Sequence, residues 1–238
     1  MVTDILIKTY PGDYQWLPFC LKSIHKFVKG VRQVVIAAPP GDDFLSTLTA
    51  ETVIRLPDRD PGYLWQQAVK LTAPQFTEAD RIIHVDSDMI FKREFTPEML
   101  LTPSGKIKWL KCPWAKCGNS ERNAWRPVMS KFFLGRETHF EYMRQSLFMV
   151  PREAYHYVNI SCELMHGMGI VDYVMRQPAN EFSEYNVMGR VFEMWGLDYF
   201  EFVDTTQTPE TDAPFVRQFW SWGGLTEEVQ QEIGRILA

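Results

Sequence analysis

The chain has 238 residues, of which 45% are hydrophobic and 14% aromatic, and a formal net charge of −5 at pH 7. This composition excludes an intrinsically disordered chain, and no stretch approaches the roughly 20 apolar residues that a membrane-spanning helix needs. The first residues also lack the basic start and small-residue cleavage site of a signal peptide, so we expect a cytoplasmic protein with no membrane partner and with reduced cysteines.

The first hundred residues predict an alternation of strands and helices. Buried-strand patterns cover residues 4–10, 33–38, 52–56 and 82–85, and apolar residues at helical spacing cover 14–29 and 63–71. Asp42 or Asp43 is positioned to cap a short helix that ends near residue 50. This β-α-β-α order predicts an α/β fold with a doubly wound, mostly parallel sheet flanked by helices.

The second half of the chain is less regular. Helices are expected near residues 152–158, 160–176, 183–195 and 226–237, and short strands near 107–112, 147–150 and 199–203. No internal repeat, low-complexity tract or linker interrupts the sequence. We therefore expect a single domain over residues 1–238.

An apolar strand that ends at Val85 is followed at once by Asp86-Ser87-Asp88. Ligands of open α/β sheets bind just beyond the carboxyl ends of the strands, where these two carboxylates are expected to lie. Like charges so close together disfavour joint ionisation unless a counter-charge is present. Mg²⁺ or Mn²⁺ carrying a diphosphate supplies one, because these ions combine a few carboxylate oxygens with phosphate and water. We therefore predict Asp86 and Asp88 as metal ligands, and His84, on the strand itself, as a core residue.

With these features the chain resembles the nucleotide-sugar glycosyltransferases of the GT-A fold, which is Rossmann-like. The resemblance is carried by a first strand ending in Thr9-Tyr10, the helix Gly62-Tyr-Leu-Trp-Gln-Gln-Ala-Val-Lys70, the Asp-x-Asp motif and, more weakly, Phe182-Ser-Glu184-Tyr-Asn186-Val-Met-Gly189. It implies a sugar transferase that uses Mn²⁺ or Mg²⁺ and a nucleotide-diphosphate sugar, for which we expect a UDP-sugar. Residues 1–95 are then the half that holds the sugar donor, and residues 96–238 the acceptor half.

The resemblance also implies roles for single residues. The Asp-x-Asp pair of the family holds the metal and the ribose or diphosphate of the sugar donor, which assigns these roles to Asp88 and Asp86. The loop after the first strand holds the nucleotide base in the family, which points to Thr9, Tyr10 and Asp13.

Breaking a sugar–diphosphate bond leaves an anionic leaving group, so a metal and fixed cations must stabilise its charge. Gln66, Gln67 and Lys70 lie within one turn of the same predicted helix. Lys70 is expected to reach the diphosphate while a glutamine amide binds the ribose or sugar. An ordinary polar helix face explains the same pattern.

An inverting transfer also needs a carboxylate that takes the proton of the acceptor hydroxyl. Glu184, at the start of a predicted helix, is the candidate, because an acidic residue at a comparable position often has this role in the family. Asp172 is the reserve candidate. The alternative for Glu184 is a structural role at the helix N-terminus.

The family often supplies another metal ligand, usually His, near the C-terminus, and here the sequence departs from it. Residues 205–224 contain no His, and Glu210 and Asp212 are their only carboxylates. This leaves two alternatives, binding by the two motif carboxylates alone or Asp204 as the candidate third ligand. The aromatic run that ends in Trp222 is expected to cover the sugar donor instead.

The acceptor prediction rests on charge. Residues 105–136 contain eight basic residues and one acid, a local charge of +7, whereas the rest of the chain carries −12. Basic side chains neutralise phosphates and aromatic rings stack on bases, which predicts a nucleic-acid acceptor. The acceptor candidates are Lys108, Lys111, Trp114, Trp125 and Arg126. The soluble glycosyltransferases that modify hydroxymethylated bases of phage DNA are the family members that this combination resembles.

Other readings stay open. The same tryptophans suit a saccharide or another small acceptor, or simply cover the sheet. A nucleotidyltransferase shares the sheet and the metal carboxylates, but it should carry a basic, Gly-rich loop where this chain has Pro11-Gly12-Asp13. A non-catalytic nucleotide or nucleic-acid binding module would not need Asp86, Asp88 and Glu184 together.

Overall fold

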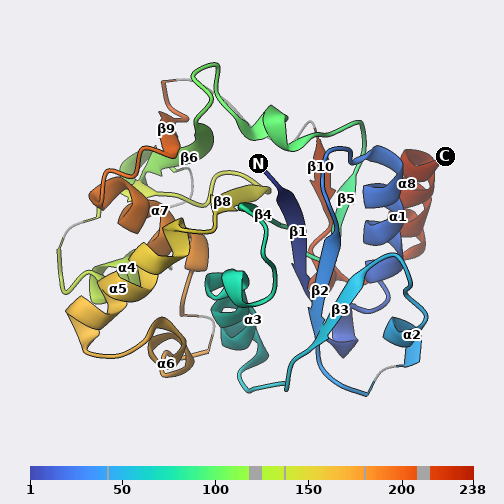
Figure 1. The fold of residues 1–238 in the computed structure, drawn as a ribbon, viewed down its shortest axis with the longest axis horizontal. Coiled ribbons are helices and arrows are strands. Elements are labelled where there is room, and N and C mark those ends of the chain that lie inside the picture. The colour runs from blue at the N-terminus through green and yellow to red at the C-terminus, as the bar shows by residue number, and fades with distance from the viewer. Residues whose placement is uncertain (42, 118–124, 137, 180, 208–214) are drawn as a thin grey trace.

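The computed structural model describes residues 1–41, 43–117, 125–136, 138–179, 181–207 and 215–238. Its centre is a five-stranded sheet of order β3-β2-β1-β4-β8 (Figure 1). The strands are β1 (Thr3–Lys8), β2 (Val34–Ala38), β3 (Thr52–Arg55), β4 (Arg81–His84) and β8 (Phe148–Pro151). The first four run parallel, and β8 pairs antiparallel to β4 at the edge. The predicted α/β architecture with a mostly parallel sheet is therefore confirmed.

Helices flank this sheet on both sides (Figure 1). The helices α1 (Leu17–Phe27) and α8 (Glu227–Leu237) lie together on one side, where Lys26 Nζ donates to the carbonyl of Leu237 at 3.0 Å. The helix α3 (Gly62–Leu71) lies on the other side, toward α5 (Ala154–His166), α6 (Ile170–Met175) and α7 (Glu184–Met194). The shorter helices are α2 (Asp43–Ser46) and α4 (Trp125–Phe132).

Two smaller sheets complete the fold. In the first, β5 (Met89–Phe91) pairs antiparallel with β10 (Val216–Gln218). In the second, β6 (Ile107–Pro113) lies between β7 (Phe140–Glu141) and β9 (Phe200–Asp204). The β5–β10 pair matters for the site, because it brings the segment after Gln218 against the residues after β4.

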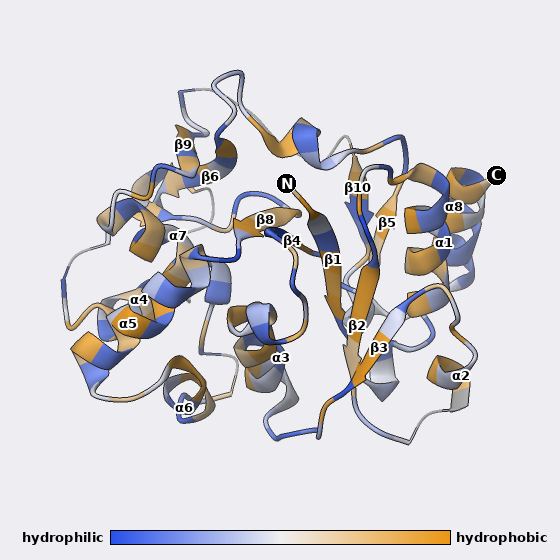
Figure 2. Ribbon diagram, in the orientation of Figure 1, coloured by the Kyte–Doolittle hydropathy of each residue, from blue (hydrophilic) through white to orange (hydrophobic). Residues whose placement is uncertain are grey.

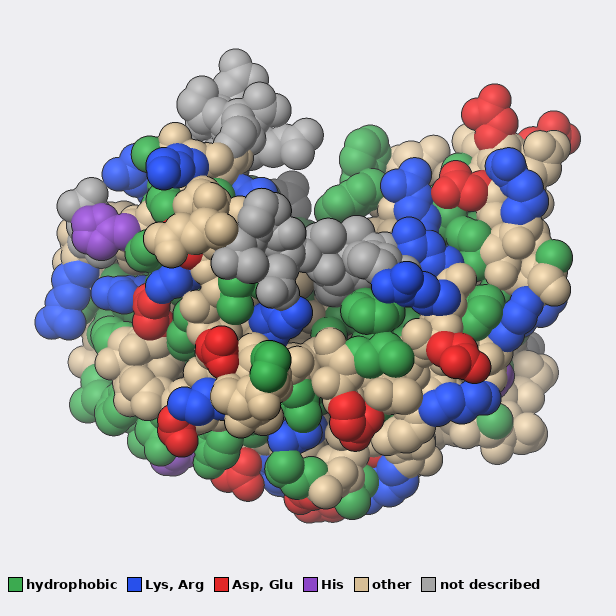
Figure 3. Space-filling model, turned by 90° about the horizontal axis from the view of Figure 1, so that it is seen from above, with side chains coloured by type: hydrophobic (Ala, Val, Ile, Leu, Met, Phe, Trp, Pro, Cys, Tyr) green, Lys and Arg blue, Asp and Glu red, His purple; other side chains and the backbone are tan. Residues whose placement is uncertain are grey.

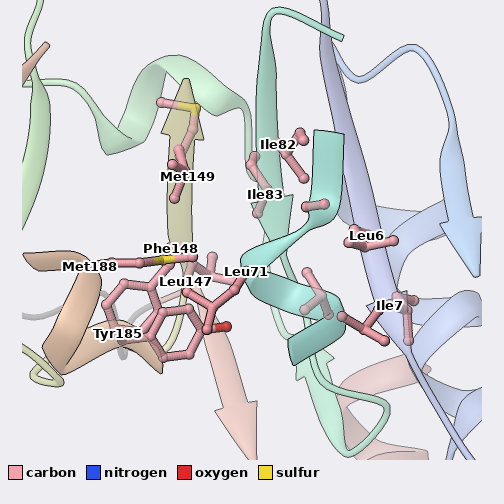
Figure 4. Close-up of a cluster of buried hydrophobic side chains, with 14 of the residues drawn as sticks. Leu6, Ile7, Leu71, Ile82, Ile83, Leu147, Phe148, Met149, Tyr185 and Met188 are labelled. Carbon is pink, nitrogen blue, oxygen red and sulfur yellow. The ribbon is translucent and has the colours of Figure 1, made fainter. Parts of the chain in front are cut away.

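Apart from the edge strand β3, the strands of the central sheet are built mainly from buried apolar residues, as Figure 2 shows for β2. On the α3 side, Leu6, Ile82 and Ile83 of the sheet face a cluster to which α3 and α7 contribute (Figure 4). Within it the rings of Phe148 and Tyr185 stack with centroids 3.7 Å apart and planes 6° apart. This stack seats the first turn of α7 against the edge strand and so fixes where the preceding residue, Glu184, lies.

The structure corrects several predicted elements. The helical region near 152–176 breaks at Gly167, a left-handed cap with φ of 67°, rather than near residue 159. The elements α4, β5, β7 and β10 were not predicted. Three of them are strands of two or three residues, too short for an apolar period to be recognised. The predicted cap Asp42 lies outside the described residues, and no helix among those described is long and apolar enough to cross a membrane.

The remaining local predictions agree with the structure. His84 is a buried core residue whose Nε2 lies 2.6 Å from the Tyr155 hydroxyl. Burial lowers the pKa of His84 to about 3, so its ring is neutral. All four cysteines are free thiols.

Candidate active site

A cavity of about 590 Å³ opens beyond the carboxyl ends of β1 and β4. The chain runs outward from β1 to β2 and β3 and then crosses back to β4 on the other side of β1, so the strand order reverses between β1 and β4. Such a switch point is where open α/β sheets bind ligands. The cavity is lined from both predicted halves of the chain. Its lining residues are Lys8, Tyr10, Asp13, Asp58, Gly62, Tyr63, Gln66, Gln67, Lys70, Asp86, Asp88, Trp125, Met143, Glu184, Tyr185, Gln218, Trp220, Ser221 and Trp222.

The two motif carboxylates both line this cavity but have different partners. Asp86 Oδ1 accepts from Lys70 Nζ at 2.8 Å and from Gln66 Nε2 at 3.4 Å. Asp88 Oδ2 accepts from the backbone N–H of Ser221 at 2.7 Å, and its Oδ1 is buried without a hydrogen-bond partner. Burial, together with the charge of Asp86, raises the pKa of Asp88 to about 6. Asp88 is therefore the carboxylate that most needs a positive ligand.

Lys70 joins the motif to the candidate base. Its Nζ lies 2.8 Å from Asp86 Oδ1 and 3.0 Å from Glu184 Oε1, and its side chain is 5% exposed. The ammonium also lies over the Tyr185 ring, 5.0 Å from the centroid. Burial by itself lowers the pKa of Lys70, but the neighbouring carboxylates outweigh it and hold the pKa well above its usual value. A permanent cation is thus fixed between Asp86 and Glu184, where the sequence predicted a lysine reaching into the site.

The helix α3, which carries Lys70, also contacts the backbone of Glu184. Gln67 Oε1 accepts from the backbone N–H of Glu184 at 2.9 Å. Glu184 is the first residue of α7, and Ser183, at the cap position, makes no capping side-chain hydrogen bond. The Glu184 carboxylate contacts Lys70, which lies on α3 and not on its own helix. The contacts that fix Glu184 come from the turn of α3 that the sequence selected.

The loop after β1 contributes a second group of polar residues. Asp13 is buried, its Oδ2 accepts from Ser87 Oγ at 3.2 Å, and its Oδ1 has no partner. Burial raises the pKa of Asp13. Lys8, the last residue of β1, is also buried, and its Nζ donates to the carbonyl of Thr9 at 2.7 Å. Burial lowers the pKa of Lys8.

The loop 219–224 closes one side of the cavity. Its Phe219 N–H donates to the backbone carbonyl of Asp88 at 3.1 Å, in addition to the Ser221 contact with the carboxylate. Trp220 has a φ of 57°, a left-handed conformation that is uncommon for a residue with a side chain. This turn leaves the rings of Trp220 and Trp222 51% and 86% exposed at the cavity edge. Trp222 therefore lies where the sequence predicted a cover.

The donor set of the cavity fits a hard divalent cation. Asp88 offers a buried carboxylate oxygen without a partner, and Mg²⁺ and Mn²⁺ prefer such oxygens. Among the described residues, no three His, Cys, Asp or Glu side chains converge to hold a metal by themselves. Asp204, the candidate third ligand, lies at the end of β9, where its Oδ1 accepts from Thr206, and it does not line the cavity. Glu210 and Asp212 lie outside the described residues. The fit is thus to a cation that takes its other ligands from phosphate and water.

Two residues predicted for the sugar-donor site and for the base, Thr9 and Asp172, do not line the cavity. Thr9 is fully buried at the end of β1, where its N–H donates to the Ala37 carbonyl, so Thr9 does not line the cavity. Asp172 is exposed on α6 and does not line the cavity either. The carboxylate of Glu184 is therefore the one of the two predicted bases that can meet a bound substrate.

The predicted acceptor residues are largely dispersed. Of Lys108, Lys111, Trp114, Trp125 and Arg126, only Trp125 lines the cavity. Trp114 is 6% exposed and cannot stack on a base or sugar without rearrangement. Lys111 forms an ion pair with Glu193 and lies 4.2 Å from the centroid of the Phe140 ring. The alternation of basic and aromatic residues in this segment follows from a strand whose Trp109 faces the core.

Several cavity residues were not singled out from the sequence. Lys8 had a recognisable signal, since a lysine that ends an otherwise buried strand is unusual. The others are Asp58, Tyr63, Met143, Tyr185 and Gln218. Most of these reach the cavity through long-range contacts that a local pattern does not reveal.

No family model matches the chain, and no curated protein matches it by sequence. Two solved structures to which it is similar are both of the glycosyltransferase GlyE of Streptococcus pneumoniae TIGR4, the second in its apo form. They give TM-scores of 0.47 and 0.45 at 10% identity over 88% and 86% of this chain. The chain spans about half of their length, 47% and 46%. Similarity at this level assigns neither activity nor substrate to the chain.

Proposed function

We propose that this protein is a metal-dependent glycosyltransferase of the GT-A type, which transfers a sugar from a nucleotide-diphosphate sugar, a UDP-sugar by our expectation, to an acceptor hydroxyl. The observation that carries the proposal is the cavity at the β1–β4 switch point. It is lined by Asp88, Asp86, Lys70 and Glu184, and Lys70 forms ion pairs with both Asp86 and Glu184. Nucleotides bind at this place in open α/β sheets. The two motif carboxylates supply a cation site, and the buried Lys70–Glu184 pair supplies a second polar centre.

Each residue has a distinct task in this proposal. Asp88, with its unpartnered Oδ1, and Asp86 hold the divalent cation, which when bound stabilises the negative charge that develops on the departing diphosphate. Lys70 keeps the Asp86 and Glu184 side chains oriented. Glu184 accepts the proton of the acceptor hydroxyl as that oxygen attacks the sugar. Tyr10 and Asp13, after β1, bind the nucleoside end.

The proposal is tested by ligand-induced stabilisation of the full chain. We expect UDP to raise the melting temperature in Mn²⁺ but not in EDTA, because the diphosphate needs the cation to approach two carboxylates. A ligand at a hundredfold excess over its Kd adds about 2.7 kcal/mol of stability. The variant Asp88→Ala should lose this stabilisation, whereas Asp198→Asn, which changes an exposed carboxylate outside the cavity, should retain it. Equal stabilisation by UDP in EDTA would contradict the metal bridge.

Release of UDP from a UDP-sugar panel then measures the activity. A chain that binds UDP with Mn²⁺ but releases none from any UDP-sugar, with or without acceptors, is a nucleotide-binding module and not a transferase. Formation of a bond to a nucleotide, with loss of pyrophosphate, would instead indicate a nucleotidyltransferase.

A further inference from the structure

The mouth of the cavity is unusually rich in exposed apolar side chains. Among the described residues, thirteen large hydrophobic side chains are exposed, and five of them line this one cavity: Tyr10, Tyr63, Met143, Trp220 and Trp222. Polar side chains, including Gln66, Gln67 and Glu184, line the cavity beneath them. Binding sites for small polar molecules combine such apolar walls with a few placed polar groups.

Two of these side chains flank the candidate base. The Tyr63 hydroxyl donates to the carbonyl of Phe182 at 3.1 Å, and Ser183 Oγ contacts Met143 Sδ at 3.7 Å. Tyr63 and Met143 therefore adjoin the segment that leads directly into Glu184. They are 36% and 37% exposed, so each presents an accessible surface beside the carboxylate.

The cavity also holds a polar group without a partner. Gln67 is 2% exposed and lines the cavity, and its Nε2 has no hydrogen-bond partner, while its Oε1 is occupied by the Glu184 N–H. A buried N–H group without a partner is costly, which favours a ligand that brings an acceptor oxygen. A hydroxyl-rich ligand supplies this oxygen and also the proton that Glu184 would accept.

The charge around the cavity opposes a polyanionic acceptor. Five carboxylates line it against two lysines, a net charge of −3, and one of the lysines, Lys70, is already paired with Asp86 and Glu184. Of the basic residues 105–136, no described Lys or Arg lines the cavity. Figure 3 shows the face opposite the cavity, seen from the amino-terminal end of β1, where basic side chains are interspersed with acidic ones. A bound diphosphate and divalent cation would leave this negative balance nearly unchanged.

We infer that the acceptor is an uncharged saccharide, bound with the C–H face of one ring against Tyr63 and Met143 and with hydroxyls directed to Gln67 and Glu184. This inference rests on the proposed function and names its acceptor class. Tyr63 is then an acceptor-binding residue. The neutral ring requires no cations at the mouth, whereas a nucleic acid would have to bring its phosphates toward the five carboxylates.

Binding of labelled full-length protein to an array of neutral and acidic oligosaccharides tests this inference without requiring transfer. The array also carries duplex DNA containing hydroxymethylcytosine, and the buffer contains UDP and Mn²⁺. We expect retention on neutral oligosaccharides that changes little between low and high salt. Tyr63→Ala should weaken it about tenfold or more, or about 1.4 kcal/mol. Tyr63→Phe, which keeps the ring, should retain most of the binding.

The matched control is Tyr199→Ala, which removes a tyrosine ring outside the cavity at a residue that is 44% exposed, and it should leave saccharide binding unchanged. UDP affinity in Mn²⁺ should be the same in all three variants. Retention only on DNA, with a steep loss of binding as salt rises, or only on acidic glycans, overturns the inference. So does the absence of retention on every neutral saccharide by a protein that binds UDP. Failure of the proposed function is distinguished by the loss of UDP binding itself.

Discussion

The backbone N–H of Ser221 donates a 2.7 Å hydrogen bond to Asp88 Oδ2, across 133 positions of sequence. The other oxygen of Asp88, a residue that lines the cavity, is buried and has no hydrogen-bond partner. One carboxylate thus tethers the loop that carries Trp220 and Trp222 while it keeps an oxygen available for a cation. In the proposed function, cation binding and the position of this loop are therefore coupled through a single side chain.

This coupling predicts that Ser221→Pro, which removes the amide hydrogen, weakens UDP binding in Mn²⁺. The hydrogen bond stabilises the charged form of Asp88, which is the form that binds a cation. A hydrogen bond to a charged group is worth about 1.5–3 kcal/mol, so the Kd should rise by roughly 10- to 100-fold. Isothermal titration calorimetry measures this change. Ser221→Ala keeps the amide and should have a much smaller effect; an equal effect would assign the role to the hydroxyl.

A second prediction separates catalysis from binding. Glu184→Gln keeps the shape of the side chain and an oxygen that can accept from Lys70, but it cannot take a proton. We expect unchanged UDP affinity in Mn²⁺ and a loss of turnover of roughly 10²-fold or more. The control is Glu181→Gln, three residues earlier, where the side chain is exposed and does not line the cavity. Unchanged turnover in Glu184→Gln would remove this residue from the mechanism.

A third prediction concerns the packing that holds α7 in place. A Cβ at Gly189 would lie 2.5 Å from Tyr142 Cβ and 2.7 Å from Trp109 Nε1, much closer than real contacts. Gly189→Ala should therefore lower the free energy of unfolding by about 1–3 kcal/mol. Urea denaturation gives this value. The matched substitution Gly234→Ala, in exposed α8 with no neighbour within 4 Å, should instead stabilise the protein by up to about 1 kcal/mol.

A fourth prediction is a loss of stability in acid that originates at Asp4. This carboxylate is fully buried, and Arg32 donates to both of its oxygens, at 3.0 and 2.6 Å. Burial raises the pKa of Asp4, but the hydrogen bonds from Arg32, Thr77 and Gln33 outweigh it and lower the pKa below 3.8. The folded state then binds fewer protons than the unfolded state, so stability is lost as pH falls from about 5 through the folded pKa.

Urea titrations between pH 7 and pH 2 measure this loss. Asp4→Asn should be less stable at pH 7 and should lose less stability across the acid range than the unsubstituted protein. Asp198→Asn, which changes a carboxylate that is 92% exposed, should follow the unsubstituted curve. An acid profile unaltered by Asp4→Asn would show that other groups govern it.

The sheet and the place of the Asp-x-Asp motif could be predicted from local sequence patterns. The strands β1 and β2 consist of buried residues, as does β4 after Arg81. A strand that is buried on both faces is recognisable in the sequence as a mainly apolar run. Asp86 and Asp88 were recognisable because they end such a run. Gln66, Gln67 and Lys70 were recognisable because a helical turn places them on neighbouring positions.

Which residues meet at the cavity depends on long-range contacts that no local sequence pattern reveals. Ser221 reaches Asp88 because β10 pairs with β5, two three-residue strands that are far apart in the chain and carry no local signal. The same holds for Lys70 and Glu184, whose contact depends on α7 being seated by the Phe148–Tyr185 stack. The basic segment illustrates the converse. Its charge is plain in the sequence, but Trp109 of β6 is buried against Phe192 of α7. Lys111, two residues later and so on the same face of the strand, is paired with the next residue of α7, Glu193, because β6 packs on that helix.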